Sequence, residues 1–99
     1  MEQCLLMIIA PPSVEETMVD WLLQTEDIGG FSSCEAFGHG ARHSGMSLLE
    51  QVTGRQKRTQ FIICTEVDVA RRLVMEMRER FAEIGLHYFI LPVIEAGCL

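Results

Sequence analysis

Short apolar runs and amphipathic segments alternate along the chain. Runs rich in β-branched or aromatic residues predict strands at 4–10, 60–64 and 87–94, and a mixed run at 31–38 predicts an exposed or edge strand. Between them, two segments carry apolar side chains every three or four positions, as one face of a helix does. These side chains are Val14, Met18, Trp21 and Leu22 in the first segment, and Ala70, Leu73, Met77, Phe81 and Ile84 in the second.

Both amphipathic segments have signals for the helix ends. Ser13-Val14-Glu15-Glu16 and Thr65-Glu66-Val67-Asp68 have the spacing of a capping box, in which side chains bind the free N–H groups of the first turn. Gly29-Gly30 and Gly85 are stop signals. We therefore expect one helix between Ser13 and Gly29 and another between Thr65 and Gly85.

The resulting order is strand, helix, strand, strand, helix, strand. It predicts an α+β protein with the ferredoxin-like βαββαβ fold, an antiparallel four-stranded sheet with two helices on one face. The first and third strands then lie at the centre, and Pro92, which has no N–H for the ladder, indicates that the last strand is at an edge. The 99 residues suffice for a single domain, 1–99, with a long loop at about 39–58.

The first, third and fourth strands do not alternate between apolar and polar residues. In the first strand, Leu5, Met7 and Ile9 point to one face of the sheet, and Leu6 and Ile8 point to the other. Two helices cover only one face, so the second apolar face needs another cover. The simplest cover is a second copy of the chain, and we expect a closed symmetric oligomer.

The expected loop at 39–58 differs from the rest of the chain in charge. It contains four of the eight basic residues, Arg42, Arg55, Lys57 and Arg58, but only one of the fourteen acids, Glu50. Loops of about twenty residues are uncommon in compact domains and are usually functional or disordered. The net charge of −6 argues against general nucleic-acid binding. We therefore expect function in this basic loop.

The chain shows no targeting or membrane segment. The run at 4–10 follows no basic region, so a signal peptide is not expected, and no run approaches the roughly 18 apolar residues of a transmembrane helix. The four cysteines, Cys4, Cys34, Cys64 and Cys98, form no CxxC motif. We expect a cytoplasmic protein with free thiols that is not embedded in a membrane.

Several motifs in the chain resemble those of the PII-like superfamily. They are Pro11-Pro12, Val19-Asp20-Trp21-Leu22, Gly38-His39-Gly40, His43, Leu48, Glu50-Gln51-Val52, Gly54-Arg55-Gln56, Arg58, Phe61, Leu86-His87-Tyr88 and Leu91-Pro92-Val93. The chain is most similar to an uncharacterised bacterial family of this superfamily, whose genes often accompany heavy-metal efflux pumps, and more distantly to the CutA metal-tolerance proteins. The resemblance implies a homotrimer whose sheets pack together and a regulatory role, with a metal-efflux pump as a candidate partner.

Nucleotide binding in the manner of the PII proteins is not expected. Those proteins use a glycine-rich loop and basic residues near the C-terminus. We align that loop with Cys64-Thr65-Glu66-Val67-Asp68, which has two acids and no glycine, and the chain has no basic tail before Leu99. Acidic side chains would repel a phosphate.

The basic loop supplies the candidate binding residues. They are Glu50, Gln51, Arg55, Gln56 and Arg58. Arginine can bind an anion, a nucleotide phosphate or an acidic protein surface. An alternative of equal weight is that Arg55, Lys57 and Arg58 keep the base of the loop soluble or pair with acids on an adjacent subunit. No set of nucleophile, base and acid stands out, so we do not expect an enzyme.

His39 and His43 are candidate ligands for a transition metal such as zinc or copper. Two ligands do not complete a tetrahedral site, so Cys34, Glu50, His87 or a neighbouring subunit would supply the others. The alternative is that both histidines are hydrogen-bonded or exposed. Two hypotheses follow: a PII-like regulatory protein that senses a ligand or docks on a partner through 39–58, or a CutA-like metal-binding protein that uses His39 and His43.

Overall fold

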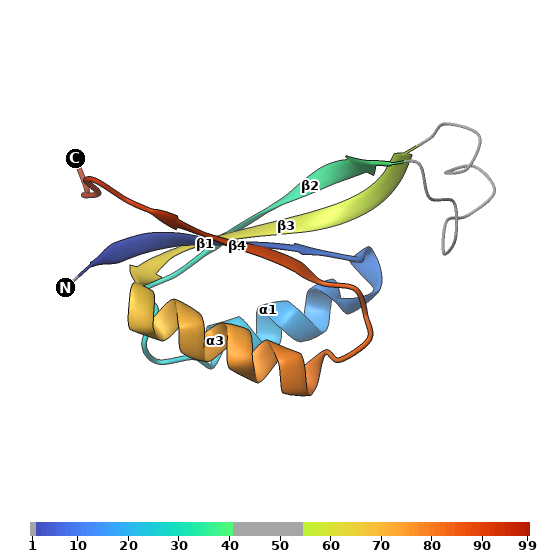
Figure 1. The fold of residues 1–99 in the computed structure, drawn as a ribbon, viewed down its shortest axis with the longest axis horizontal. Coiled ribbons are helices and arrows are strands. Elements are labelled where there is room, and N and C mark those ends of the chain that lie inside the picture. The colour runs from blue at the N-terminus through green and yellow to red at the C-terminus, as the bar shows by residue number, and fades with distance from the viewer. Residues whose placement is uncertain (1, 41–54) are drawn as a thin grey trace.

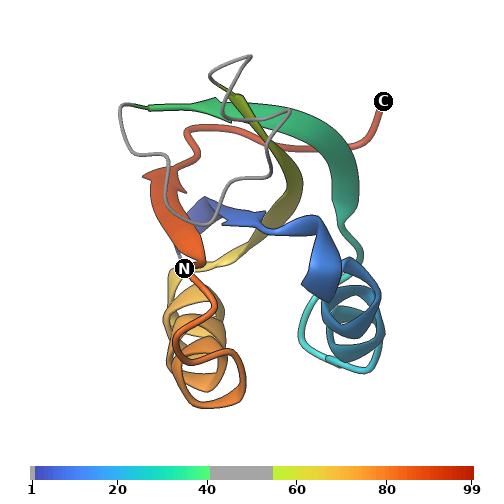
Figure 2. The same cartoon turned by 90° about the vertical axis from the view of Figure 1, so that its right-hand side faces the viewer.

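The computed structural model describes residues 2–40 and 55–99. A four-stranded antiparallel sheet, in the order β2-β3-β1-β4, has two helices on one side and none of the described elements on the other (Figures 1 and 2). The elements are β1 (Gln3–Ala10), α1 (Glu15–Leu23), β2 (Ser32–His39), β3 (Arg55–Glu66), α3 (Val67–Arg80) and β4 (His87–Pro92). The predicted ferredoxin-like fold is confirmed, with the first and third strands at the centre.

The core lies between the sheet and the two helices. Every second residue of the central strands is buried there: Cys4, Leu6, Ile8 and Ala10 in β1, and Thr59, Phe61, Ile63 and Thr65 in β3. The helices contribute Met18, Trp21, Leu22, Ala70, Leu73, Val74 and Met77. Burial, with a smaller effect of Cys64, raises the pKa of the Cys4 thiol. The burial of these helix residues confirms the predicted apolar faces of both helices.

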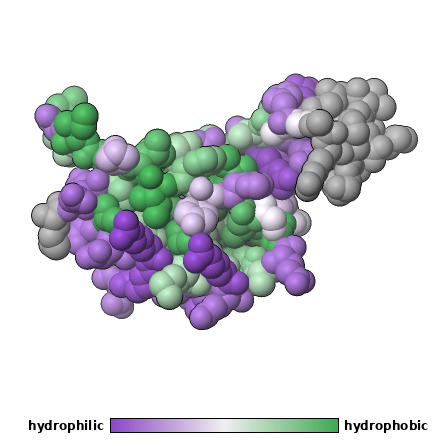
Figure 3. Space-filling view, in the orientation of Figure 1, coloured by the Kyte–Doolittle hydropathy of each residue, from purple (hydrophilic) through white to green (hydrophobic). Residues whose placement is uncertain are grey.

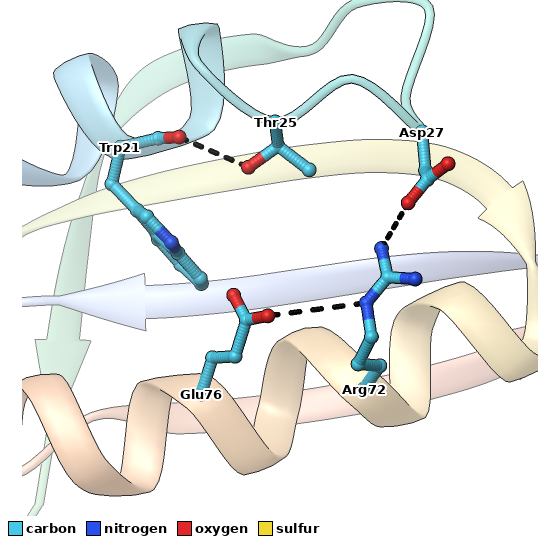
Figure 4. A network of polar contacts seen from close by, with 5 residues as sticks. All are labelled: Trp21, Thr25, Asp27, Arg72 and Glu76. Carbon is cyan, nitrogen blue, oxygen red and sulfur yellow. Dashed lines mark hydrogen bonds and ion pairs between the residues drawn. The ribbon is translucent and has the colours of Figure 1, made fainter.

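The predicted helix ends are wrong, and neither helix has a side-chain cap. Residues Pro12–Val14 form a 3-10 turn, so α1 starts two residues after Ser13. It ends at Leu23, well before Gly29, and the Thr25 hydroxyl donates to the Trp21 carbonyl at 3.0 Å (Figure 4). The spacing of apolar residues does not indicate a 3-10 turn or a side-chain hydrogen bond of this kind, so it could not predict these helix ends.

The second helix starts directly where β3 ends. Thr65, the expected cap, is still in the sheet opposite Cys4, and the Val67 N–H donates to the Glu2 carbonyl at 3.1 Å. The first free N–H of α3 is thus satisfied by the backbone of the residue before β1. A strand partner distant in sequence therefore replaces the local cap.

Side-chain contacts also join α3 to the end of α1 and the connection that follows it. Arg72 of α3 forms an ion pair with Asp27 in the α1–β2 connection, and its Nε lies 3.9 Å from Glu76 Oε1 (Figure 4). The rings of Trp21 and Phe81 lie 5.8 Å apart in the core. Exposed ion pairs contribute about 0–1 kcal/mol, so the aromatic pair is the larger source of stability.

The β2–β3 hairpin is longer than the sequence indicates. Its strands remain paired out to His39 opposite Arg55, so the loop expected at 39–58 is too long at both ends. The outer part of the hairpin, which we call the hairpin end (residues 35–39 and 55–59), projects beyond the helices (Figure 1). Beyond Thr59, which is still buried, it lacks the apolar alternation of a strand because no core lies beneath it.

Candidate functional site

The side of the sheet without helices, which we call the open face, is largely apolar. The strand register brings Leu91, Leu5 and Cys64 into one row across the sheet, and Phe89, Met7 and Ile62 into the next. We define the open-face strip as Leu5, Met7, Ile9, Ile62, Phe89 and Leu91. Phe89 is 53% exposed and Leu91 41% exposed in the single chain. Such a contiguous apolar surface is typical of a protein interface.

The hairpin end continues the open face with polar residues. Arg58 is opposite Ala36, and Gln56 is opposite Gly38, so these four side-chain positions share the open face because their spacing is even. The Arg58 guanidinium Nη2 donates to Gln56 Oε1 at 2.7 Å. This bond holds the guanidinium group beside the small residues Ala36 and Gly38. The arrangement can receive a carboxylate or another anion.

Arg55 and His39 lie on the other face of the hairpin end. They are opposite each other in the register, and odd spacing separates them from Arg58 and Gln56. The Arg55 guanidinium lies 4.6 Å from the centroid of the exposed Phe37 ring, a cation–π contact. The expected cluster is therefore divided between two faces, with Gln56 and Arg58 on one and Arg55 on the other.

The remaining predicted site residues lie outside the described residues. They are Glu50, Gln51 and His43, together with Arg42 and the other residues of 41–54. Within residues 2–40 and 55–99, no group of three or more His, Cys, Asp or Glu side chains could hold a metal ion. Over the same ranges, no helix is long and apolar enough to cross a membrane.

Two of the suggested additional metal ligands, Cys34 and His87, are not close to His39 in one chain. Cys34 and His87 share an open-face row with Ile9 and Gln60, at opposite edges of the sheet. Three strand spacings separate them, about 14 Å. His39 is on the opposite face. A site that combined these residues would therefore need more than one chain.

The end of the sheet farthest from the hairpin end is acidic. A groove of about 780 Å³ lies there between α3 and the residues after β4, and Glu2, Glu95 and Arg71 line it. Glu66 is at the N-cap of α3, and Asp68 lies in its first turn. These two acids stand at the position that we aligned with the phosphate-binding loop, and a helix N-terminus with two carboxylates is a poor anion site.

A second groove was not predicted by the sequence. It has a volume of about 460 Å³ and lies between the last turn of α3 and the start of β4, with Met77, Phe81 and Leu86 in its lining. Arg78 Nη2 donates to the Tyr88 hydroxyl at 3.1 Å beside it. The pair comes from two elements ten residues apart, and no local motif indicates it.

A family model described as "Protein of unknown function (DUF3240)" matches residues 1–99. No functionally curated protein is detectably similar in sequence. Among solved structures, a DUF3240 family protein from Shewanella baltica OS155 is similar with a TM-score of 0.81 and 21% identity, over 100% of this chain and 98% of that one.

Two other structures have the same fold at low sequence identity. A protein from Thermus thermophilus that is described as PII-like and signalling has a TM-score of 0.66 and 18% identity, over 94% of this chain and 91% of that one. The periplasmic divalent cation tolerance protein CutA from Archaeoglobus fulgidus has a TM-score of 0.71 and 10% identity, over 95% and 86%. The predicted relationship to PII-like and CutA proteins is confirmed at the level of the fold.

Proposed function

The chain belongs to the DUF3240 family and has the fold of PII-like proteins, and from this premise we propose that it is a non-enzymatic regulatory or interaction protein. It acts through residues 39–58, as a ligand sensor or a docking element. The observation that carries this proposal is the hairpin end, which holds Arg58 and Gln56 on a projection next to an apolar open face. The physiological setting that we propose is heavy-metal efflux in the cytoplasm, because the family resemblance points to efflux-pump genes.

The proposal includes a homotrimer built on the open-face strip. Burial of an apolar side chain such as Phe89 or Leu91 contributes about 1.5–3 kcal/mol when it becomes complete. Three copies that share this surface would bring their hairpin ends into defined positions. Glu50, Gln51, Arg55, Gln56 and Arg58 are then the residues that we propose to contact the ligand or partner.

Replacement of residues 40–54 by Asn-Gly tests the role of the loop. This dipeptide favours the tight turn that joins two paired strands, and it would connect His39 to Arg55, which are already opposite each other. Native mass spectrometry with zinc, copper and ATP added separately reads the subunit count and the bound mass. We expect the wild type to bind one probe per chain, and the variant to bind it at least tenfold more weakly with an unchanged subunit count.

Two results would contradict this account. One is a variant without the loop that binds the same probe as tightly as the wild type. The other is turnover of ATP to ADP by the wild type, which would make the protein an enzyme. A wild type that assembles but takes up none of the probes would favour the docking role over the sensing role.

The second candidate is metal binding in the manner of the CutA proteins. Two observations favour it: the fold similarity to a divalent cation tolerance protein, and the exposed position of His39 at the tip of β2. A His39→Ala, His43→Ala double variant is expected to lose zinc and copper uptake while it keeps its subunit count. His87→Ala, which removes an exposed histidine on β4, is the matched control. Full metal affinity in the double variant would exclude this candidate.

A further inference from the structure

The residues after β4 form an extended segment that projects from the sheet. We call residues 93–99 the C-terminal tail. The Val93 N–H donates to the Gln3 carbonyl at 3.2 Å, and within the described ranges no hydrogen bond or ion pair holds residues 94–99. Ile94 and Leu99 are fully exposed. In Figures 1 and 2 the tail lies on the side away from the helices, and Figure 3 shows it as a largely hydrophobic projection.

The tail cannot reach the hairpin end of its own chain. Val93 is bonded to Gln3, which is opposite Glu66 at the far end of β3. Arg58 lies eight residues earlier in that strand, about 26 Å away at 3.3 Å per residue. Glu95 is two residues beyond Val93 and extends at most about 7 Å from it. A contact between Glu95 and Arg58 therefore requires two chains.

The tail and the hairpin end are complementary in charge. Glu95 is an exposed carboxylate of the tail that lines the groove beside α3, and Arg71, which lines the same groove, forms no ion pair with it among residues 2–40 and 55–99. Arg58 is held in place by Gln56 and keeps further N–H donors for a carboxylate. Opposite these residues are the small Ala36 and Gly38, and the Arg58 side chain lies over Gly38, with its Cγ 3.7 Å from the position that a Cβ would take there.

We propose that the C-terminal tail of one chain docks on the open-face side of the hairpin end of the next, where the Glu95 carboxylate binds the Arg58 guanidinium. This inference rests on the proposed assembly through the open-face strip, and it names a second copy of the chain as the partner of Arg58. The contact is heterologous, since one end of the molecule meets the other. Such contacts close into rings when the rotation between copies allows it. The acidic and basic ends then neutralise each other around the ring.

Charge reversal at both ends tests the pairing. We expect Arg58→Glu and Glu95→Arg each to accelerate subunit exchange about tenfold or more, because each places two like charges together. The double variant, which carries both changes in one chain, restores attraction and is expected to return to within about twofold of the wild-type rate. The exchange is followed by native mass spectrometry after unlabelled and ¹⁵N-labelled protein are mixed, and circular dichroism checks that every variant folds.

A second acid at the same end provides the matched control. Glu2 lines the groove beside Glu95 but precedes β1 and is not in the tail. Glu2→Arg is expected not to rescue Arg58→Glu. Rescue by Glu2→Arg equal to that by Glu95→Arg, or failure of the double variant to recover, would overturn the pairing. If the wild type is a monomer, the proposed assembly fails; if it is an oligomer whose exchange is insensitive to Arg58→Glu, the tail contact alone is wrong.

Discussion

Replacement of Phe89 by aspartate is expected to convert the assembled protein into single chains of 11.2 kDa. Phe89 is opposite Met7 in the middle of the open-face strip. In an assembly through this face, each copy would bury a carboxylate among apolar side chains without a hydrogen-bond partner. Burial of an unpaired polar group costs about 2–7 kcal/mol, and burial of a charge costs more. This free-energy cost arises at every interface of a closed ring.

The measurement is light scattering at micromolar concentration, with circular dichroism as a check of the fold. Because Phe89 is 53% exposed in the single chain, the substitution leaves the core of each chain intact. Met75→Asp is the matched control, since Met75 on α3 is 64% exposed and does not belong to the sheet. Wild-type mass in Phe89→Asp would show that the open face is not the interface.

Phe61→Ala is expected to lower the free energy of unfolding by about 3–5 kcal/mol. Phe61 is fully buried at the centre of β3, between β1 and β2, and its ring lies 6.3 Å from that of Phe31. Removal of the ring leaves a cavity between the sheet and the helices that the central strands cannot close. A domain of this size has about 5–15 kcal/mol of stability in total, so the loss would be severe.

Urea unfolding at one fixed protein concentration measures this effect, because dissociation contributes to the stability of an oligomer. Phe37→Ala is the control: it removes the same ring from the hairpin end, where Phe37 is 41% exposed. We expect Phe37→Ala to cost less than about 1 kcal/mol, in the range of exposed substitutions and cation–π contacts. Equal losses in the two variants would contradict the location of the core.

The apolar period was sufficient to predict the fold. Positions such as Leu6, Met18 and Leu73 are buried as their spacing requires, because sheet and helix periods differ and each buries one face. The ends of the elements were harder to predict. Ser13 and Thr65 have the sequence of a cap, but a 3-10 turn and a distant strand take their places. The turn and the strand contact that replace the caps depend on the folded structure around them, and a local sequence pattern does not contain this information.

The candidate site was predicted in composition but not in geometry. The excess of basic residues near 55–58 was visible in the sequence, yet their division between two faces follows from the pairing of β2 with β3. A strand without core beneath it has no apolar alternation, so the sequence of the hairpin end has the pattern of a loop. The tail gave no signal either, since Glu95 gains significance only from its distance to Arg58.

The mass of the wild-type protein in solution tests the central claim most directly. The account holds that the open-face strip is covered by copies of the same chain, and that this places each hairpin end for its role. Light scattering at micromolar concentration is predicted to give three times the chain mass of 11.2 kDa. A mass of 11.2 kDa under the same conditions would contradict the assembly and, with it, the proposed contact between Arg58 and the tail of the next chain.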